Sequence, residues 1–400
     1  MLHSLLVRYI YKIVPEPYMD EIFHVDQTRR YCSHNFTWNP KITTPPALYV
    51  ISVPLFCGHE RYANSALIPF AFVGCCQFRR LFQKNSESSL LVSLAVLLLP
   101  VLFHSSLLYY TDLLSLTTVL WALSQPPGLF PTLIFALSLC TRQTNIIWAA
   151  AYGCVHFFLL LKNEGKFTAK AVISSLLRLW SLLLLPIAFI VFYVLNDRSI
   201  VLGDHSAHRP VPHFMQIHYF FVFFIFSAAP LLGSNLKTFQ SLGRLVFSPR
   251  KNFISTVLLI FCVFFFTMQH PYLLADNRHF TFYIWRRWFL RHPLCRYLTV
   301  PLYIVSLQLF RYTVSHWPRF LVLLYILGTV AVVVPVHLVE PRYFITSYVI
   351  WRLSYVDRPL TVLLLELLYE AIVNVFVLYL FLAKPFEWPH EPGVKQRFMW

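Results

Sequence analysis

Long apolar runs, broken by short polar loops, limit what this 400-residue sequence can fold into more than any other feature. A helix that crosses a membrane needs about 20 predominantly apolar residues, and one that is rich in Leu, Phe and Val all round has no face for water. With a short stretch at 1–14 and a partial helix at 47–57, the runs predict an all-α polytopic membrane protein with roughly 11 to 13 spans. The main runs lie at 62–78, 88–104, 112–125, 129–141, 144–161, 172–195, 214–233, 253–269, 298–312, 319–336, 343–355 and 360–382.

The composition agrees with a membrane protein. Hydrophobic residues make up 58% of the chain and charged residues 12%, whereas soluble globular proteins carry about 25% charged residues. The net charge of +16 would suit a nucleic-acid-binding protein. However, the basic residues stand in short loops between apolar runs and form no soluble basic domain. We therefore expect membrane lipid, and no nucleic acid, as a partner.

Lys and Arg in the short loops predict which side of the membrane each loop faces. Loops 79–84, 162–170, 234–252 and 311–319 are basic and fall on one face, which we assign to the cytosol. Segment 286–296 carries several Arg on the opposite face, where they need a functional reason such as phosphate binding. The opposite face receives 16–46, 105–111, 142–145, 196–213, 270–297 and 337–342.

We predict a single membrane domain over 1–400. It comprises a short or truncated first span at 1–14, a first loop at 15–46, a multi-span body at 47–382 and a polar tail at 383–400. The 8 cysteines show neither CxxC nor metal-ligand spacing. Cys32 and Cys295 lie in polar loops on the same side, where a disulfide between them is possible but is not what we expect.

Acidic residues gather on the non-cytosolic face. Glu16, Asp20 and Glu21 stand together in "EPYMDEIFH" (16–24), although the whole chain has only 17 acids. Polar strings at 141–145, 203–208, 273–280 and 339–344 fall on the same face. One carboxylate with several cations suits transfer of a group from a phosphate, because the carboxylate takes a proton from a hydroxyl and the cations stabilise the leaving phosphate. No GxxxxGK[ST] or GxGxxG string is present, so a sugar on a lipid phosphate fits better than a soluble nucleotide sugar.

These strings carry a resemblance to a known family. The Asp-Glu pair in the first non-cytosolic loop is typical of the membrane-embedded GT-C glycosyltransferases. Within that superfamily the chain resembles the dolichyl-phosphate-glucose alpha-1,2-glucosyltransferase family from about residue 16 to residue 400. The strings that carry the resemblance are "EPYMDEIFHVDQTRRYC", "WNPKITTPPALY", "RQTNIIW", "GDHSAH", "LLADNRHFTFYIWRR", "EPRYFITSYVIWRL" and "QRFMW".

The resemblance implies a GT-C fold whose lumenal loops form the site, in the endoplasmic reticulum membrane. It also implies transfer of the third, terminal glucose from dolichyl phosphate glucose to a dolichyl-diphosphate oligosaccharide that bears two glucoses. Asp20 would act as general base on the acceptor 2-hydroxyl with inversion at the anomeric carbon. Glu21 is the rival for that role.

The resemblance also points to the residues that bind the donor phosphate. Arg342 in "EPRYF" is the first candidate, and Arg278 and His279 in "ADNRHF" come next. Arg142 in "RQTN" and His205 in "GDHSAH" are weaker candidates. A metal is possible through Asp204, His205 and His208, but their spacing is poor. The resemblance implies no cofactor and no metal, as in other GT-C enzymes that use dolichyl-phosphate sugars.

Other interpretations of the same residues stay open. Asp20 and Glu21 could cap a helix, since acids favour its first turn. Arg278 and Arg342 could extend from span ends toward the membrane interface. Glu366 and Glu370, four apart on one helix face, suit a structural contact better than catalysis.

Two other functions also compete with the glucosyltransferase. One is a non-catalytic membrane protein such as a channel-associated subunit, and the other is a GT-C enzyme that uses another dolichyl-phosphate sugar.

Overall fold

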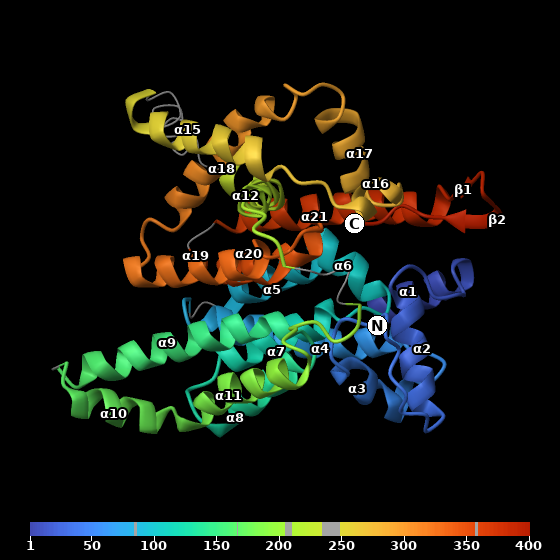
Figure 1. Ribbon diagram of the computed structural model, residues 1–400. Helices are drawn as coiled ribbons and strands as arrows, with labels where there is room; N and C mark the ends of the chain where they lie inside the picture. The colour runs from blue at the N-terminus through green and yellow to red at the C-terminus, as the bar shows by residue number, and fades with distance from the viewer. Residues whose placement is uncertain (84–85, 166, 205–209, 234–248, 357–358) are drawn as a thin grey trace. The chain divides into compact units, whose positions relative to one another are not determined.

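The computed structural model describes residues 1–83, 86–165, 167–204, 210–233, 249–356 and 359–400. These residues form helices and one two-stranded antiparallel sheet (Figure 1), which confirms the all-α prediction. The helices are α1 (Leu2–Ile13), α2 (Glu21–Cys32), α3 (Ala47–Phe56), α4 (Arg61–Arg80), α5 (Ser86–Leu98), α6 (Pro100–Leu107), α7 (Asp112–Leu123), α8 (Leu129–Leu139), η1 (Gln143–Asn145), α9 (Ile146–Asn163), α10 (Ala169–Arg178), α11 (Trp180–Leu195), α12 (Met215–Ser227), α13 (Ala229–Gly233), α15 (Pro249–Phe266), α16 (Pro271–Ala275), α17 (Phe280–Ile284), η2 (Trp285–Phe289), η3 (Tyr297–Thr299), α18 (Val300–Thr313), α19 (Arg319–Val333), η4 (Pro341–Phe344), α20 (Ile345–Ser354) and α21 (Leu360–Ala383). The strands are β1 (Phe386–Trp388) and β2 (Glu391–Gln396).

Each predicted apolar run coincides with a helix or a pair of helices, with ends shifted by a few residues. Two runs predicted as continuous spans are broken, however. The run at 88–104 bends by 64° between α5 and α6, and the run at 172–195 bends by 77° between α10 and α11. Pro100 explains the first break, because its ring clashes with the preceding turn and it has no N–H for the helix ladder. Pro186 lies inside α11 and not at the second break.

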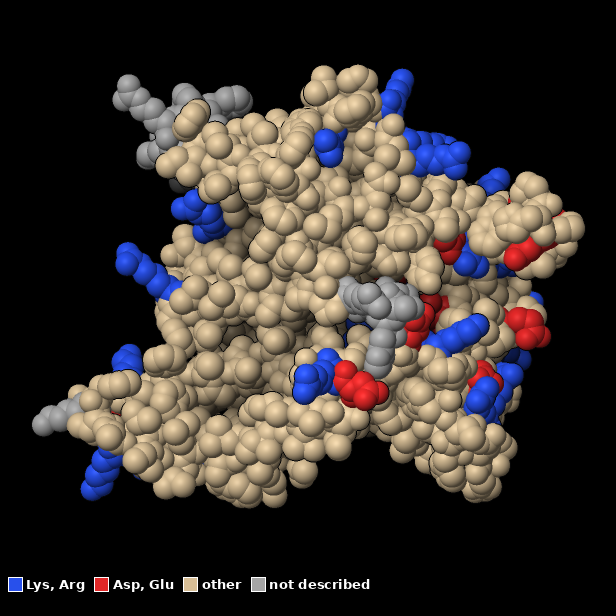
Figure 2. Space-filling view, in the orientation of Figure 1, with Lys and Arg blue, Asp and Glu red and all other residues tan. Residues whose placement is uncertain are grey.

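Two described helices are long and apolar enough to cross a membrane, Gln143–Asn163 and Leu360–Ala383, and each bent pair could supply one more span. Several of the remaining apolar helices are shorter, for example α7, α8 and α12. The predicted number of spans therefore stays a prediction. On the face drawn in Figure 2 most of the surface is neither acidic nor basic, in keeping with a chain of 12% charged residues.

The first loop and the tail contain more structure than the sequence suggested. The predicted loop at 15–46 includes α2, whose polar and charged residues leave no periodic apolar pattern to read. The predicted polar tail includes the β1–β2 hairpin. Both elements are polar, so their structure depends on tertiary contacts and not on an apolar pattern.

The chain divides into two compact units. Unit 1 comprises Met1–Lys84, Ser105–His208 and Leu323–Gly328, and unit 2 comprises Asn85–His104, Arg209–Val322 and Thr329–Trp400. In unit 1, α7 packs against α4 and α8, and α11 packs against α8 and α9. In unit 2, α12 packs against α18, and α21 packs against α5.

Candidate active site

The two acids of the first loop stand at the start of α2. Met19 before them has a φ of 57°, a left-handed conformation that is uncommon outside glycine. Backbone strain of this kind costs on the order of 1–3 kcal/mol and clusters at functional sites. Asp20 takes the N-cap position, but its side chain makes no cap hydrogen bond to the described backbone of α2. Asp20 therefore stands where a helix cap would stand, but its side chain does not cap the helix.

Glu21 is completely buried, and both of its carboxylate oxygens are engaged. Oε1 accepts hydrogen bonds from Nε of Arg61 at 2.7 Å and from the backbone N–H of Tyr109 at 2.9 Å. Oε2 accepts from Nη2 of Arg61 at 2.7 Å and from the backbone N–H of Tyr18 at 3.0 Å. A carboxylate offers about four lone-pair sites, and these four hydrogen bonds occupy them.

Arg61, the first residue of α4, is only 1% exposed. Its Nη1 donates to the carbonyl of Val14 at 2.6 Å and its Nη2 donates to the carbonyl of Glu16 at 2.9 Å, in addition to the bonds to Glu21. The guanidinium also lies over the ring of Tyr11, 4.7 Å from its centroid. One buried cation therefore joins the end of α1, the connecting segment and the first turn of α2 to the start of α4.

A disulfide and a second ion pair hold the other end of α2. Cys32 is bonded to Cys57, which was not predicted, while Cys295 is a free thiol, in line with the expectation that it does not pair with Cys32. Nε of Arg29 lies 2.9 Å from Oε1 of the buried Glu60. The disulfide was missed because Cys57 follows an apolar helix and nothing in the sequence places it against α2.

The buried side of α2 contrasts with the exposure of Asp20. Nδ1 of His24 lies 2.7 Å from the hydroxyl of Tyr49, and the hydroxyls of Thr28 and Tyr109 are 2.9 Å apart. Asp20 itself keeps an intermediate exposure at the start of the same helix. The helix thus buries one face and leaves the first acid partly open to solvent.

Three of the strings that carry the family resemblance meet in unit 1. The side-chain amide of Gln143, in "RQTN", donates to the carbonyl of Thr43, in "WNPKITT", at 2.8 Å. Gly203, in "GDHSAH", lies so close to this segment that a Cβ would stand 2.3 Å from the carbonyl oxygen of Ile42. Only glycine allows that approach without a shift of the backbone.

Arg142, which directly precedes η1, contacts the start of α7. Its Nη2 lies 2.9 Å from Oδ1 of Asp112, and its Nε donates to the hydroxyl of Thr111 at 3.1 Å. The segment just before α7 includes Tyr109, whose N–H binds Glu21. In unit 1, Glu21 and Arg142 therefore both contact the short connection between α6 and α7, at Tyr109 and Thr111 respectively.

In unit 2, Arg278 is held by protein groups. Its Nη2 lies 2.7 Å from Oδ2 of Asp276, its Nη1 donates to Oε1 of Gln396 at 3.1 Å, and the guanidinium lies 4.8 Å from the ring centroid of Trp388. Burial pushes the pKa of Asp276 upward, but the hydrogen bonds and charge of Arg278 outweigh this and hold that pKa below its ordinary value. Arg278 thus ties the 276–280 segment to the tail.

The tail pairs with the same segment through its backbone. The N–H of Met399 donates to the carbonyl of Arg278 at 2.9 Å, and the N–H of Phe280 donates to the carbonyl of Met399 at 3.2 Å. Nδ1 of His279 donates to the carbonyl oxygen of Trp400 at 2.8 Å. The "ADNRHF" and "QRFMW" strings, distant in sequence, therefore form one structural element.

Arg342 and the mid-helix acids of α21 are also placed in unit 2. Arg342 in η4 is 8% exposed, and its Nη2 lies 2.9 Å from Oε2 of Glu340. This burial does not fit a side chain that extends to the membrane interface. Glu366 accepts from Nε of Arg352 at 2.6 Å, and both are buried, which confirms the structural interpretation of Glu366. Glu370 is also buried.

Sequence comparisons identify the family to which these residues belong. A sequence model of the DIE2/ALG10 family matches residues 14–168 and 154–353. The chain belongs to the DIE2/ALG10 family. The predicted resemblance is therefore confirmed, and the prediction of an enzyme, rather than a channel-type protein, agrees with it.

Relatives in the DIE2/ALG10 family share the name Dol-P-Glc:Glc(2)Man(9)GlcNAc(2)-PP-Dol alpha-1,2-glucosyltransferase. The protein from Rattus norvegicus is 36% identical, over 96% of this chain and 93% of its own length. A Homo sapiens relative is 34% identical with the same coverage, and the Arabidopsis thaliana protein is 31% identical over 97% of this chain and 96% of its own. No solved structure matches the chain.

Not every predicted DIE2/ALG10 site residue can be placed. His205 lies outside the described residues, as does His208. Within the described residues, no group of three or more His, Cys, Asp or Glu is arranged to hold a metal ion. The absence of a metal therefore stays a prediction.

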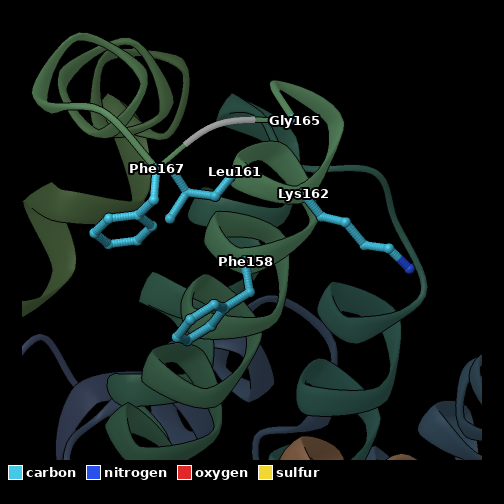
Figure 3. Close-up of a pocket in the computed structure, with 5 residues that line it drawn as sticks. All are labelled: Phe158, Leu161, Lys162, Gly165 and Phe167. Carbon is cyan, nitrogen blue, oxygen red and sulfur yellow. The ribbon is translucent and has the colours of Figure 1, made fainter.

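A hollow at the turn between α9 and α10 is distinct from these residues. Phe158, Leu161, Lys162, Gly165 and Phe167 line it, and Figure 3 shows the apolar side chains near the turn while Lys162 points away. The lining includes no carboxylate, and it lies on a basic loop assigned to the cytosolic face. We do not place the chemistry there.

Arg61 is the residue that sequence reasoning missed in this member of the DIE2/ALG10 family. Its signal was present, because Glu60 and Arg61 form a charged pair at the very start of an apolar run. Charged residues in such a place are expensive to bury and call for a partner. In the structure that partner is Glu21, 40 residues earlier in the chain.

Proposed function

We propose that this chain adds the third, terminal glucose to lipid-linked oligosaccharide in the endoplasmic reticulum membrane. The donor is dolichyl phosphate glucose and the acceptor is the dolichyl-diphosphate oligosaccharide that bears two glucoses. Family membership and the names of the relatives support the reaction and both substrates. Transfer occurs with inversion, and Asp20 is the general base.

One observation carries the assignment of the base. The four hydrogen bonds to the Glu21 carboxylate, two of them from a buried guanidinium, occupy its lone pairs. A general base needs a lone pair within hydrogen-bond reach of the substrate proton. Asp20 is partly exposed, whereas the neighbouring Glu21 is buried. The base is therefore Asp20, and Glu21 is structural.

The chemistry then follows in one step. The Asp20 carboxylate accepts the proton of the acceptor 2-hydroxyl while that oxygen attacks the anomeric carbon of the donor glucose. The bond between this carbon and the phosphate oxygen breaks, and the electron pair leaves with dolichyl phosphate. Attack opposite the leaving phosphate turns a β-linked donor into an α-linked product.

Cations stabilise the charge that develops on the phosphate. Arg342, Arg278 and His279 are proposed for the donor phosphate on the family resemblance, with Arg142 and His205 as further candidates. The resemblance ranks Arg342 first, and Arg278 already uses three of its nitrogen atoms on Asp276 and Gln396. A planar guanidinium suits this task since it binds two phosphate oxygens at once.

The side of the membrane is supported by the disulfide. The bond between Cys32 and Cys57 lies in the segment that carries Asp20 and Glu21. Disulfides form and persist in oxidising compartments such as the lumen of the endoplasmic reticulum, and are rare in the cytosol. This agrees with a lumenal site, as the distribution of Lys and Arg predicted.

The test uses cells that lack their own terminal glucosyltransferase. They express the wild-type chain, Asp20→Asn or Glu21→Gln, and their lipid-linked oligosaccharides are profiled. We expect the wild type to convert the diglucosylated species to the triglucosylated one and Asp20→Asn to abolish that conversion. Glu21→Gln retains part of it.

Asp26→Asn is the matched control, because Asp26 lies on the same helix and forms a solvent-exposed ion pair with Arg30. It should behave as the wild type. A dead Glu21→Gln beside an active Asp20→Asn would contradict the base assignment. A folded wild-type chain that makes no third glucose would contradict the reaction, and a purified enzyme that prefers dolichyl phosphate mannose would change the donor.

A further inference from the structure

The contacts of Arg61 assign it a task in the reaction. We infer that Arg61 is the positioning residue for the general base: through its two-pronged bond to Glu21 it fixes the start of α2, and thereby the direction of the Asp20 carboxylate. The inference rests on the proposed role of Asp20 and deepens it. Arg61 itself touches no reacting atom, since it is 1% exposed.

The number and geometry of the contacts support this role. Glu21 and Arg61 share two parallel hydrogen bonds of 2.7 Å each, a bidentate arrangement that fixes orientation as well as distance. Two carbonyls before α2, those of Val14 and Glu16, accept from the Nη atoms of Arg61. The segment on both sides of Asp20 is therefore tied to the same guanidinium.

The backbone at Met19 gives independent support. A φ of 57° in a non-glycine residue persists only where its surroundings determine it. Here Tyr18 is fixed by its N–H bond to Glu21, and Glu21 is fixed by Arg61. Met19 and Asp20 lie between these fixed points, so the strained turn that presents Asp20 depends on the ion pair.

The burial of both charges makes alternatives to the ion pair costly. Glu21 is 0% exposed and Arg61 is 1% exposed. Removing one partner of such a pair leaves an uncompensated buried charge, which is strongly destabilising, whereas a buried ion pair contributes little to net stability compared with apolar residues. A pair retained for geometry fits a site that needs one carboxylate held within a fraction of an ångström.

The experiment measures kcat and KM for donor and acceptor with purified protein in lipid nanodiscs, normalised to folded protein by its melting transition. Arg61→Lys keeps the charge and loses the two-pronged bond. Because a misplacement of about 1 Å can lower a rate about 100-fold, we expect kcat to fall by about 10- to 100-fold while both KM values change less than about threefold.

Arg29→Lys is the matched control, because Arg29 pairs with Glu60 in the same interface and does not contact Glu21. We expect its kcat within about twofold of the wild type. Should Arg61→Lys fail to fold, Glu21→Asp replaces it. The shorter carboxylate side chain disturbs the same two-pronged bond to Arg61, and we expect the same fall in kcat.

Two results would overturn the inference. One is a wild-type kcat in folded Arg61→Lys or Glu21→Asp, and the other is a loss that falls on KM alone. Both are distinguishable from failure of the proposed function. If Asp20→Asn is dead while Arg61→Lys is unimpaired, the base stands and the positioning role is wrong. If Asp20→Asn is active, the base assignment is wrong and the positioning role falls with it.

Discussion

Breaking the disulfide between Cys32 and Cys57 should loosen α2 from the start of α4 without unfolding the rest of unit 1. The bond closes a loop with a sequence separation of 25 residues. On the chain-entropy estimate, a loop of that length stabilises the closed state by about 3.5 kcal/mol. In Cys57→Ser the detached state of α2 should therefore gain a factor of roughly 400 in population. The Glu21–Arg61 and Arg29–Glu60 pairs remain and keep it a minor state.

Hydrogen exchange of the α2 amides in the purified protein measures this directly. We expect α2 to exchange at least about 100-fold faster in Cys57→Ser than in the wild type, with α7 unchanged. Cys32→Ser should match Cys57→Ser, because each removes the same bond. Cys295→Ser is the control, since Cys295 is a free thiol of intermediate exposure.

The result that would refute this expectation is equally definite. If α2 exchanges at the wild-type rate in both Cys32→Ser and Cys57→Ser, its position is set by the ion pairs alone. Peptide mapping of the unreduced protein supplies an independent check. A peptide in which Cys32 is linked to Cys295, and not to Cys57, would contradict the packing of α2 against the segment that leads into α4.

Two further predictions concern unit 2. Burial lowers the pKa of His213 from 6.5 to about 4, so the folded protein binds fewer protons than the unfolded one between these values. Stability is then lost as pH falls below 6.5, by about 2 kcal/mol at pH 5; the melting temperature should fall less with pH in His213→Gln than in the wild type, and equal pH dependence would contradict the assignment. The buried pair of Arg352 and Glu366 predicts that Glu366→Gln alone destabilises by about 3–5 kcal/mol, while the double change to Met at both positions restores most of that loss. Thermal unfolding in detergent compares the three proteins, and a double variant as unstable as the single one would show that the pair is needed for more than charge balance.

The sequence predicted the helices well because their cause is local. Membrane helices are recognised from apolar runs, and each run from 62–78 to 360–382 corresponds to helical structure. The breaks at Pro100 and near Leu179 were harder. Pro100 gave a local signal for the first break. Leu179, which separates α10 from α11, is an ordinary apolar residue, so the second break had no local signal in the sequence. Polar elements such as α2 and the β1–β2 hairpin carried no periodic signal at all.

The candidate site could be predicted only in part, for the same reason. Residue type, position along the chain and the family resemblance together pointed to Asp20, Glu21 and the arginines. What separates Asp20 from Glu21 is the set of partners, and these come from Arg61 and Tyr109, which lie 40 and 88 residues further along the chain. Sequence alone likewise left Arg278 as a candidate for the phosphate. Its bonds to Asp276 and Gln396 depend on how the tail returns to the 276–280 segment.

The two acids of the first loop illustrate how one motif supports two tasks. Neighbouring carboxylates normally repel each other. Here the charge of Glu21 is matched at 2.7 Å by Arg61 and enclosed by the protein, while Asp20 keeps access to solvent. On the proposed assignment, the second acid holds the helix and compensates the cation, and the first acts as the general base. It follows that exchanging the order of the two acids, so that Glu stands at 20 and Asp at 21, should cost more activity than shortening Glu21 alone, because it displaces both the anchor and the base.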